Sequence, residues 1–161
     1  DILHTKPKII YKEDIEQLAT ICEQLFLESN AKAALLVDHD GQYLAGHGML
    51  DDIDITSLSS LVASNMATIG GLANLLGDDE FGSVFHEGTK DSIYMSSISN
   101  YGILVVIFNK KTSLGLVRLR IKKIMSDLRL CFSEIETNTT LHGSIDQLID
   151  ITEEDIENLF Q

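Results

Sequence analysis

The stretch from 55 to 77 contains no charged residue, although the whole chain of 161 residues holds 12 basic and 25 acidic residues. Stepping about 100° per residue from Leu58 places a broad apolar arc on one side of a helix. The arc consists of Leu58, Leu61, Val62, Met66, Ile69, Leu72, Ala73 and Leu76. The opposite side holds small, weakly polar residues where a surface helix usually carries charges. The stretch therefore predicts a helix that contacts protein on both faces, or one that crosses a membrane.

The residue content of this stretch argues against the membrane. Its length would suffice, because a span needs roughly 20 residues. However, it contains four Ser, two Thr, two Asn and three Gly, and acidic residues without Lys or Arg crowd both ends. Polar groups inside a bilayer are costly, so we interpret the stretch as a helix with a core face and a contact face.

The expected contact face is built from small residues. Ala63, Ala67 and Gly71 recur at a spacing of four, which makes a flat surface that another backbone can approach closely. The residues that we expect to bind a partner on this helix are Ser60, Ala63, Ser64, Ala67, Gly70, Gly71 and Asn74. Two occupants are compatible with such a face, a second copy of the chain or a different protein.

Composition limits the environment and the partners. A hydrophobic content of 44% is enough for a proper core. No apolar N-terminal segment with a basic flank is present, and Cys22 and Cys131 both lie in helical apolar patterns. We therefore expect no signal peptide and two buried thiols in a reducing compartment, which predicts a cytoplasmic protein. A formal charge of −13 disfavours binding to nucleic acid and to an anionic membrane surface.

Charge is distributed unevenly along the second half of the chain. Seven of the 12 basic residues lie between Lys110 and Arg129, and no Lys or Arg follows Arg129. The region from Glu134 to Glu157 contributes eight acidic residues. Two interpretations remain open, a solvated helix followed by a solvated tail, or an acidic tail that docks on a basic surface of this chain or of a partner.

Hydrophobic periodicity and turn residues predict eight elements. The first is a helix that ends at Asn30, and the last is a helix that begins after Thr112 or Ser113. Between them we expect strands at 33–37 and 42–49, the uncharged helix at 55–77, and strands at 81–87, 93–98 and 103–108. The strands are joined by tight turns, which indicates an antiparallel sheet. The order α-β-β-α-β-β-β-α predicts an α/β sandwich with a five-stranded antiparallel sheet.

This domain is expected to span residues 11–135. Residues 1–10 lack periodicity and read as a loose lead-in, and 136–150 read as a flexible linker. In residues 151–161, a capping box and apolar residues at a spacing of three and four predict a short amphipathic helix. Its three apolar anchors are Ile156, Leu159 and Phe160. Such a short helix does not persist alone in water, so we expect it to bind a partner.

The sequence contains no recognisable catalytic, cofactor or metal motif. Gly70-Gly71 lies within a helix and is followed by Leu72, which does not match a phosphate-binding loop. The five histidines show no metal-ligand spacing to one another or to the cysteines. Asp38 and Asp40 resemble the start of a calcium loop, but the twelfth position is Met49 where a bidentate Glu is needed. We therefore expect a protein without catalytic residues, cofactor or metal.

Several strings resemble the Roadblock/LC7 family over residues 12–135. They are LLVDHDGQYLA, DITSLSSLVASNMATIGGLANLLG, FHEGTKDSIYM and TSLGLVRLRIKK, with DIENLF near the C-terminus. The resemblance implies a Roadblock/LC7, profilin-like fold and a homodimer. In that dimer, the strand at 81–87 pairs across a two-fold axis and two copies of the helix at 55–77 lie on one face.

The resemblance is strongest to bacterial members that regulate a Ras-like small GTPase of the MglA type in cell polarity and motility. It implies a GTPase-activating partner that inserts no catalytic residue and remodels the switch regions of the GTPase. The C-terminal helix with Ile156, Leu159 and Phe160 is implied to contact the GTPase as well. The alternatives are a scaffold that binds its partner without changing hydrolysis and a small-molecule sensor domain of similar topology.

Overall fold

The eight expected elements occur in the expected order in the computed structural model. The structure describes the backbone of residues 10–78 and 82–159. Side chains are described for 10–78, 82–141 and Asn158. The elements are α1 (Lys12–Ser29), β1 (Ala33–Val37), β2 (Tyr43–Gly48), α2 (Ile55–Leu75), β3 (Ser83–His86), β4 (Ser92–Ile98), β5 (Gly102–Phe108) and α3 (Leu114–Leu159). The predicted five-stranded antiparallel sheet is confirmed, with the strand order β2-β1-β5-β4-β3.

The two central strands explain the continuous apolar runs in the sequence. Every residue of β1 and of β5 is buried. Strands that are covered on both faces lose the alternation of polar and apolar residues that a half-exposed strand shows. β2 and β3 form the two edges of the sheet and are only partly buried.

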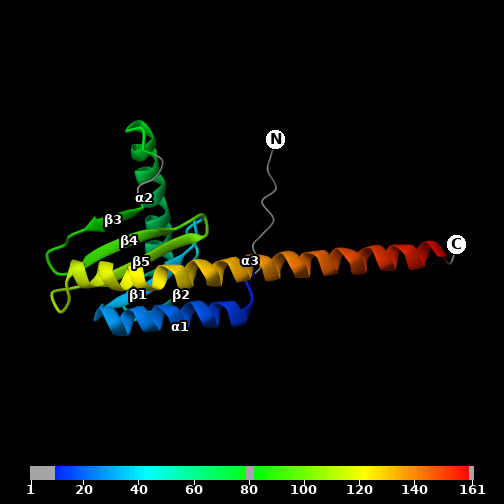
Figure 1. Cartoon of the computed structure of the whole chain (residues 1–161), viewed down its shortest axis with the longest axis horizontal. Helices are drawn as coiled ribbons and strands as arrows, with labels where there is room; N and C mark the ends of the chain where they lie inside the picture. Colours follow the sequence, from blue (N-terminus) through cyan, green and yellow to red (C-terminus); the bar gives the residue numbers. More distant parts are fainter. Residues whose placement is uncertain (1–9, 79–81, 160–161) are drawn as a thin grey trace.

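Alternate residues of the strands face two separate helical layers. Leu36, Leu104 and Val106 belong to the core shared with α1 and α3, whereas Leu35 and Val105 belong to the core beneath α2. Figure 1 shows α2 crossing one face of the sheet, while α1 and α3 lie together on the other face. The inward residues of α3 keep the predicted spacing of three and four, and they are Val117, Ile121, Ile124, Leu128, Phe132 and Ile135.

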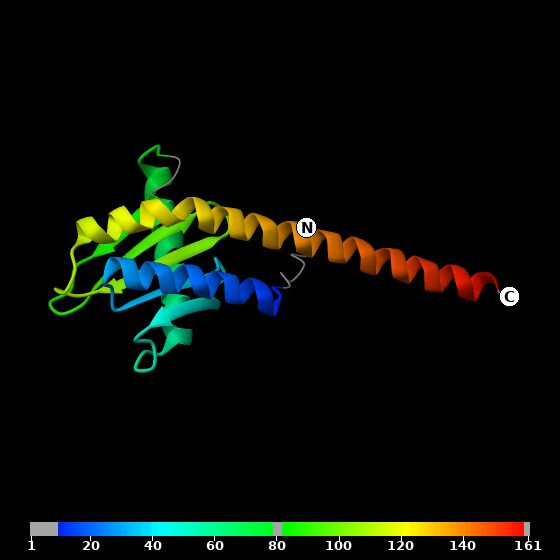
Figure 2. The same cartoon turned by 60° about the horizontal axis from the view of Figure 1, so that its bottom comes forward.

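The structure differs from the expected division of the C-terminal region. Residues 136–150 continue α3 as helix and do not form a separate linker before the helix expected at 151–161. In this region the hydroxyls of Thr137, Thr139 and Thr140 donate to carbonyls four residues earlier, at 2.9–3.0 Å. A helix that is already nucleated on the sheet also extends without a new nucleation cost. The end of α3 therefore projects beyond the domain (Figures 1 and 2).

Other sequence expectations fall at the margins of the described chain. Of the lead-in 1–10, only Ile10 is described, and it packs against the core of α1 and α3. Across 10–78 and 82–159, none of the helices is both long enough and apolar enough to cross a membrane.

Candidate partner-binding surface

The first turn of α2 is fixed by the N-cap residue Asp54. The Asp54 carboxylate accepts hydrogen bonds from the backbone N–H of Ser57 at 3.1 Å and from its hydroxyl at 2.6 Å. These bonds stabilise the ionised form, so they lower the pKa of Asp54 below its usual range. The cap supplies an acceptor for a backbone donor that the helix leaves unpaired at its start.

The inner side of α2 packs on the sheet through Val62, which is buried against Leu35, Val37, Ile103 and Val105. The turn between β1 and β2 adds a second support. Gly41 has φ +88°, and a Cβ built on it would lie 3.1 Å from the Cα of Ser60. A residue with a side chain would be strained in that conformation and would push against the helix, so glycine lets the turn touch α2 closely.

The opposite side of α2 is exposed and carries no ionisable group. We call this surface the α2 outer face, and it consists of Ser60, Leu61, Ser64, Ala67, Thr68, Gly71, Leu72 and Leu75. Leu61 is 68% exposed and Leu75 is 84% exposed. Burying such a surface removes apolar area from water without taking any charge out of water, so it favours contact with another protein.

The structure corrects the predicted division of α2 into two arcs. Leu61, Leu72 and Leu76 were expected in the core but are exposed. Conversely, Ala63 was expected on the contact face but is half-buried against the core beneath α2. Val62 and Ala73 are buried as expected, but Ser59 is buried beside them where Leu61 was expected, so the helix is rotated about its axis relative to the sequence expectation.

The remaining small residues lie as follows. Ser60, Ser64, Ala67, Gly71 and Asn74 are exposed, and Gly70 is half-buried. A Cβ built on Gly70 or on Gly71 meets no atom within 4 Å beyond the helix's own backbone. The helix backbone is therefore accessible at these two positions, and leucines flank it. Leu61, Leu72 and Leu75 are exposed residues that the periodicity did not separate from core leucines.

The residues expected at the C-terminus are placed only in part. Ile156 and Leu159 belong to the last turns of α3, whose backbone is described there, and Phe160 lies outside the described residues. Figure 1 shows that the end of α3 lies far from α2 of the same chain.

The exposed edge of the sheet at β3 is a second candidate contact. Ser97 N–H donates to the carbonyl of Gly82 at 3.0 Å, and Val84 lies opposite Met95. Because bonded and non-bonded pairs alternate in an antiparallel ladder, the backbone groups of Ser83 and Phe85 point away from β4. In the described part of the chain no strand lies beyond β3, so this edge can extend the sheet with another strand.

The fold agrees with the comparisons with known proteins. A family model described as the Roadblock/LC7 domain matches residues 17–108, and the chain belongs to this family. The chain is 46% identical to a solved structure of Myxococcus xanthus MglB, which it resembles with a TM-score of 0.74 over 79% of this chain and 96% of that chain.

Two further relatives show how far the similarity extends. A solved structure described as MglB with a tetrameric arrangement is 30% identical, with a TM-score of 0.74, over 80% of this chain and 97% of that chain. An uncharacterised protein of Aquifex aeolicus strain VF5 is 29% identical over 128 residues, which cover 78% of this chain and 76% of that protein.

Proposed function

We propose that this protein is a homodimeric activator of a Ras-like small GTPase of the MglA type, acting in the cytoplasm in control of cell polarity or motility. The identity of 46% to Myxococcus xanthus MglB across nearly the whole of that chain supports the proposal. The sequence strings described above resemble the same bacterial regulators of a Ras-like GTPase.

The single observation that carries the proposal is the uncharged, leucine-flanked α2 outer face. Leu61 and Leu75 are mostly exposed, and Gly71 leaves the helix backbone open between them. An exposed apolar patch of this kind, in a chain with 25 acidic residues, favours contact with another protein. We assign it to the GTPase, with a second contact from the end of α3 through Ile156, Leu159 and Phe160.

The homodimer in this proposal forms through the β3 edge. The backbone groups of Ser83 and Phe85 point outward and can pair with the same residues of a second copy across a two-fold axis. Pairing of the two edges would continue the sheet and place two α2 helices on one face. The assembly of a 30% identical MglB into a tetrameric arrangement supports association between copies in this group.

Activation in this proposal needs no catalytic residue from the regulator. The α2 outer face offers shape and apolar contact, which suits it to bias the conformation of the GTPase switch regions. The arginine and glutamine of the GTPase itself then supply the stabilisation that γ-phosphate transfer requires.

Single-turnover GTP hydrolysis by the cognate GTPase, with and without this protein in excess, tests the proposal. An arginine that reaches the transition-state phosphate, here the arginine of the GTPase itself, is worth a factor on the order of 10³ or more in rate. We expect an acceleration that saturates with regulator concentration. Binding without acceleration would leave the scaffold function in place of the activator, and no binding would contradict both.

A further inference from the structure

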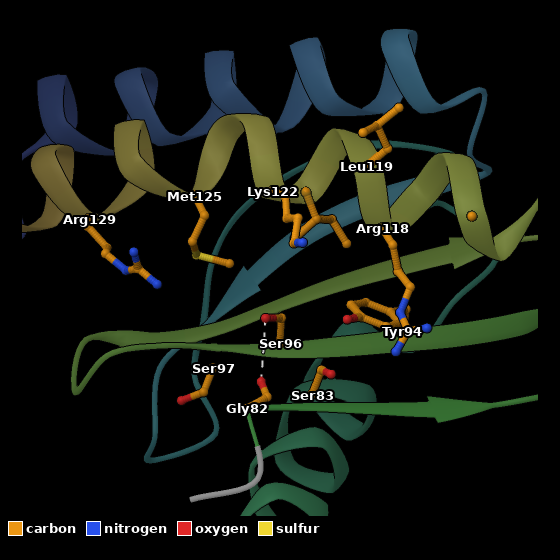
Figure 3. Close-up of a pocket in the computed structure, with 12 residues that line it drawn as sticks. Gly82, Ser83, Tyr94, Ser96, Ser97, Arg118, Leu119, Lys122, Met125 and Arg129 are labelled. Atoms are coloured by element: carbon orange, nitrogen blue, oxygen red, sulfur yellow. Dashed lines mark hydrogen bonds between the residues drawn. The ribbon is translucent and has the colours of Figure 1, made fainter.

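A basic groove lies on the side of the sheet opposite α2, between α3 and the β3–β4 edge. It encloses about 660 Å³. We call it the basic groove, and its charged residues are Arg118, Lys122 and Arg129 of α3. Figure 3 shows these side chains pointing from α3 towards the strands, where Ser83 and Ser96 form the floor.

The cations of this groove lack acidic partners among the described residues. The lining includes no Asp or Glu. The two ion pairs within the described side chains, Lys32–Asp91 and Lys123–Glu28, use other cations. The Arg118 guanidinium lies 5.9 Å from the centre of the Tyr94 ring, which orients it over the floor of the groove. In a chain with a formal charge of −13, this is a local positive site ready for an anionic ligand.

The shape and surroundings of the groove favour a short acidic protein segment. The net charge of the chain repels an extended polyanion, such as nucleic acid or a membrane surface. The lining follows α3 from Gly115 to Arg129, which is roughly 22 Å at about 1.5 Å per residue. The small side chains of Ser83, Ser96 and Ser97 line the strand side of the groove, opposite the cations of α3.

We propose that the basic groove binds the acidic C-terminal half of α3 from a second copy of the chain. The region from Glu134 to Glu157 holds eight acidic residues and no basic residue. The same chain cannot deliver this segment, because α3 runs without a break from the groove to Leu159 and projects away from the domain (Figures 1 and 2). Residues 136–159 extend roughly 36 Å, which is longer than the groove.

Two copies arranged antiparallel satisfy both grooves at once. Each copy then places its acidic half beside the basic half of the other, and the contact is closed by a two-fold axis. This association differs from pairing at the β3 edge, which depends on backbone hydrogen bonds. Screening by salt weakens contacts between exposed charges, since the Debye length is only about 10 Å at 0.1 M. The two associations can therefore be separated by ionic strength.

Light scattering of the full chain at low and high salt measures the groove contact. We expect the weight-average mass in 50 mM NaCl to be about twice that in 500 mM NaCl, at equal protein concentration. The mass in 500 mM NaCl reports the β3 dimer, so failure of the proposed dimer and failure of the groove contact give different results. An equal mass in both salts would overturn the groove proposal.

Charge reversal on each side gives a sharper test. The double variant Arg118→Glu/Lys122→Glu and the double variant Asp150→Lys/Glu154→Lys should each lose the extra mass in 50 mM NaCl. Mixing the two variants should restore it, because the lysine-bearing tail of one fits the glutamate-bearing groove of the other, and the native tail and groove also meet. A loss of folding cannot produce this recovery, and a mixture that fails to associate would overturn the proposal.

The matched control reverses the same number of charges elsewhere. Lys90→Glu/Lys110→Glu changes the formal charge by the same amount as the groove variant, on exposed loops outside the groove. We expect it to retain the twofold difference between the two salt concentrations. An equal loss of association in this control would show that overall charge, and not the groove, governs assembly.

Discussion

A Cβ built on Gly41 would lie 3.1 Å from the Cα of Ser60, so the turn between β1 and β2 rests directly against the backbone of α2. This contact joins the sheet to the N-terminal half of the helix that we assign to partner binding. The opposite, exposed side of that half carries Leu61 and Ser64. The position of the α2 outer face therefore depends on a turn that contributes no residue to it.

The substitution Gly41→Ala should lower the stability of the domain. A side chain at φ +88° costs about 1–2 kcal/mol, and the added Cβ must also displace the turn or α2. The matched control is Gly70→Ala, where a Cβ meets nothing within 4 Å and helix propensity improves by roughly 0.5–1 kcal/mol. Urea unfolding should show opposite shifts in midpoint for the two variants, and equal shifts would contradict the contact.

Asp54 should make a pH-dependent contribution to stability. Its pKa is lowered from 3.8 in the folded protein by hydrogen bonds from Ser57, so the contribution is present above pH 3.8 and is lost as the pH falls through the lowered value. Asp54→Asn keeps a capping side chain that does not titrate. The melting temperature of the native protein should exceed that of the variant at pH 7, and the gap should narrow below pH 4. A gap that is constant from pH 7 to pH 2.5 would exclude this role.

The edge geometry of β3 makes Ser83→Pro a specific probe of the dimer. Ser83 is exposed and its N–H points away from β4, so proline removes a donor that a second strand would use and spares the ladder within the chain. We expect the dimer to dissociate at concentrations where the native protein remains associated, with little change in circular dichroism. Sedimentation velocity in 500 mM NaCl measures this, and an unaffected dimer would place the interface elsewhere.

Cys22 should be unreactive in the folded protein. Burial raises the pKa of its thiol to about 12, so roughly one thiol in 10⁴ is ionised at pH 8. Iodoacetamide at pH 8 should modify Cys22 only after unfolding in urea, as read by peptide mass spectrometry. Modification of the native protein at the rate seen in urea would show that the core around α1 opens readily.

Much of the fold follows from local sequence signals. The apolar run at 103–108 and the turn residues beside it predict a central strand, and β5 is buried along its whole length. The uncharged stretch at 55–77 predicts α2 with nearly its observed bounds. These signals are local because turns, caps and strand burial depend on residues that are close together in the chain.

The sequence did not determine which side of α2 meets the sheet. Leucine occurs all round this helix, so periodicity could not distinguish Leu58, which packs on the core, from Leu61, which is exposed. Tertiary packing determines which side of α2 faces the sheet. The small residues Ser59 and Ala63 lie on that side, and the turn at Gly41 packs closely against them. The groove at Arg118 likewise depends on how α3 lies beside β4, which no local pattern specifies.

The central claim, that the α2 outer face binds the GTPase, is tested by Gly71→Arg. A side chain at this position enters open space and improves helix propensity, so the protein should fold at least as well as the native protein. The guanidinium would nevertheless occupy the middle of an uncharged contact surface. Ser126→Arg adds the same charge to an exposed position of α3 on the other face of the sheet and serves as the control.

The decisive measurement is the affinity of each variant for the cognate Ras-like GTPase loaded with a non-hydrolysable GTP analogue, by titration calorimetry. We predict that Gly71→Arg weakens binding at least 100-fold, equivalent to roughly 2.7 kcal/mol, while Ser126→Arg binds like the native protein. Native affinity in a correctly folded Gly71→Arg variant would show that the GTPase docks elsewhere and would contradict the account.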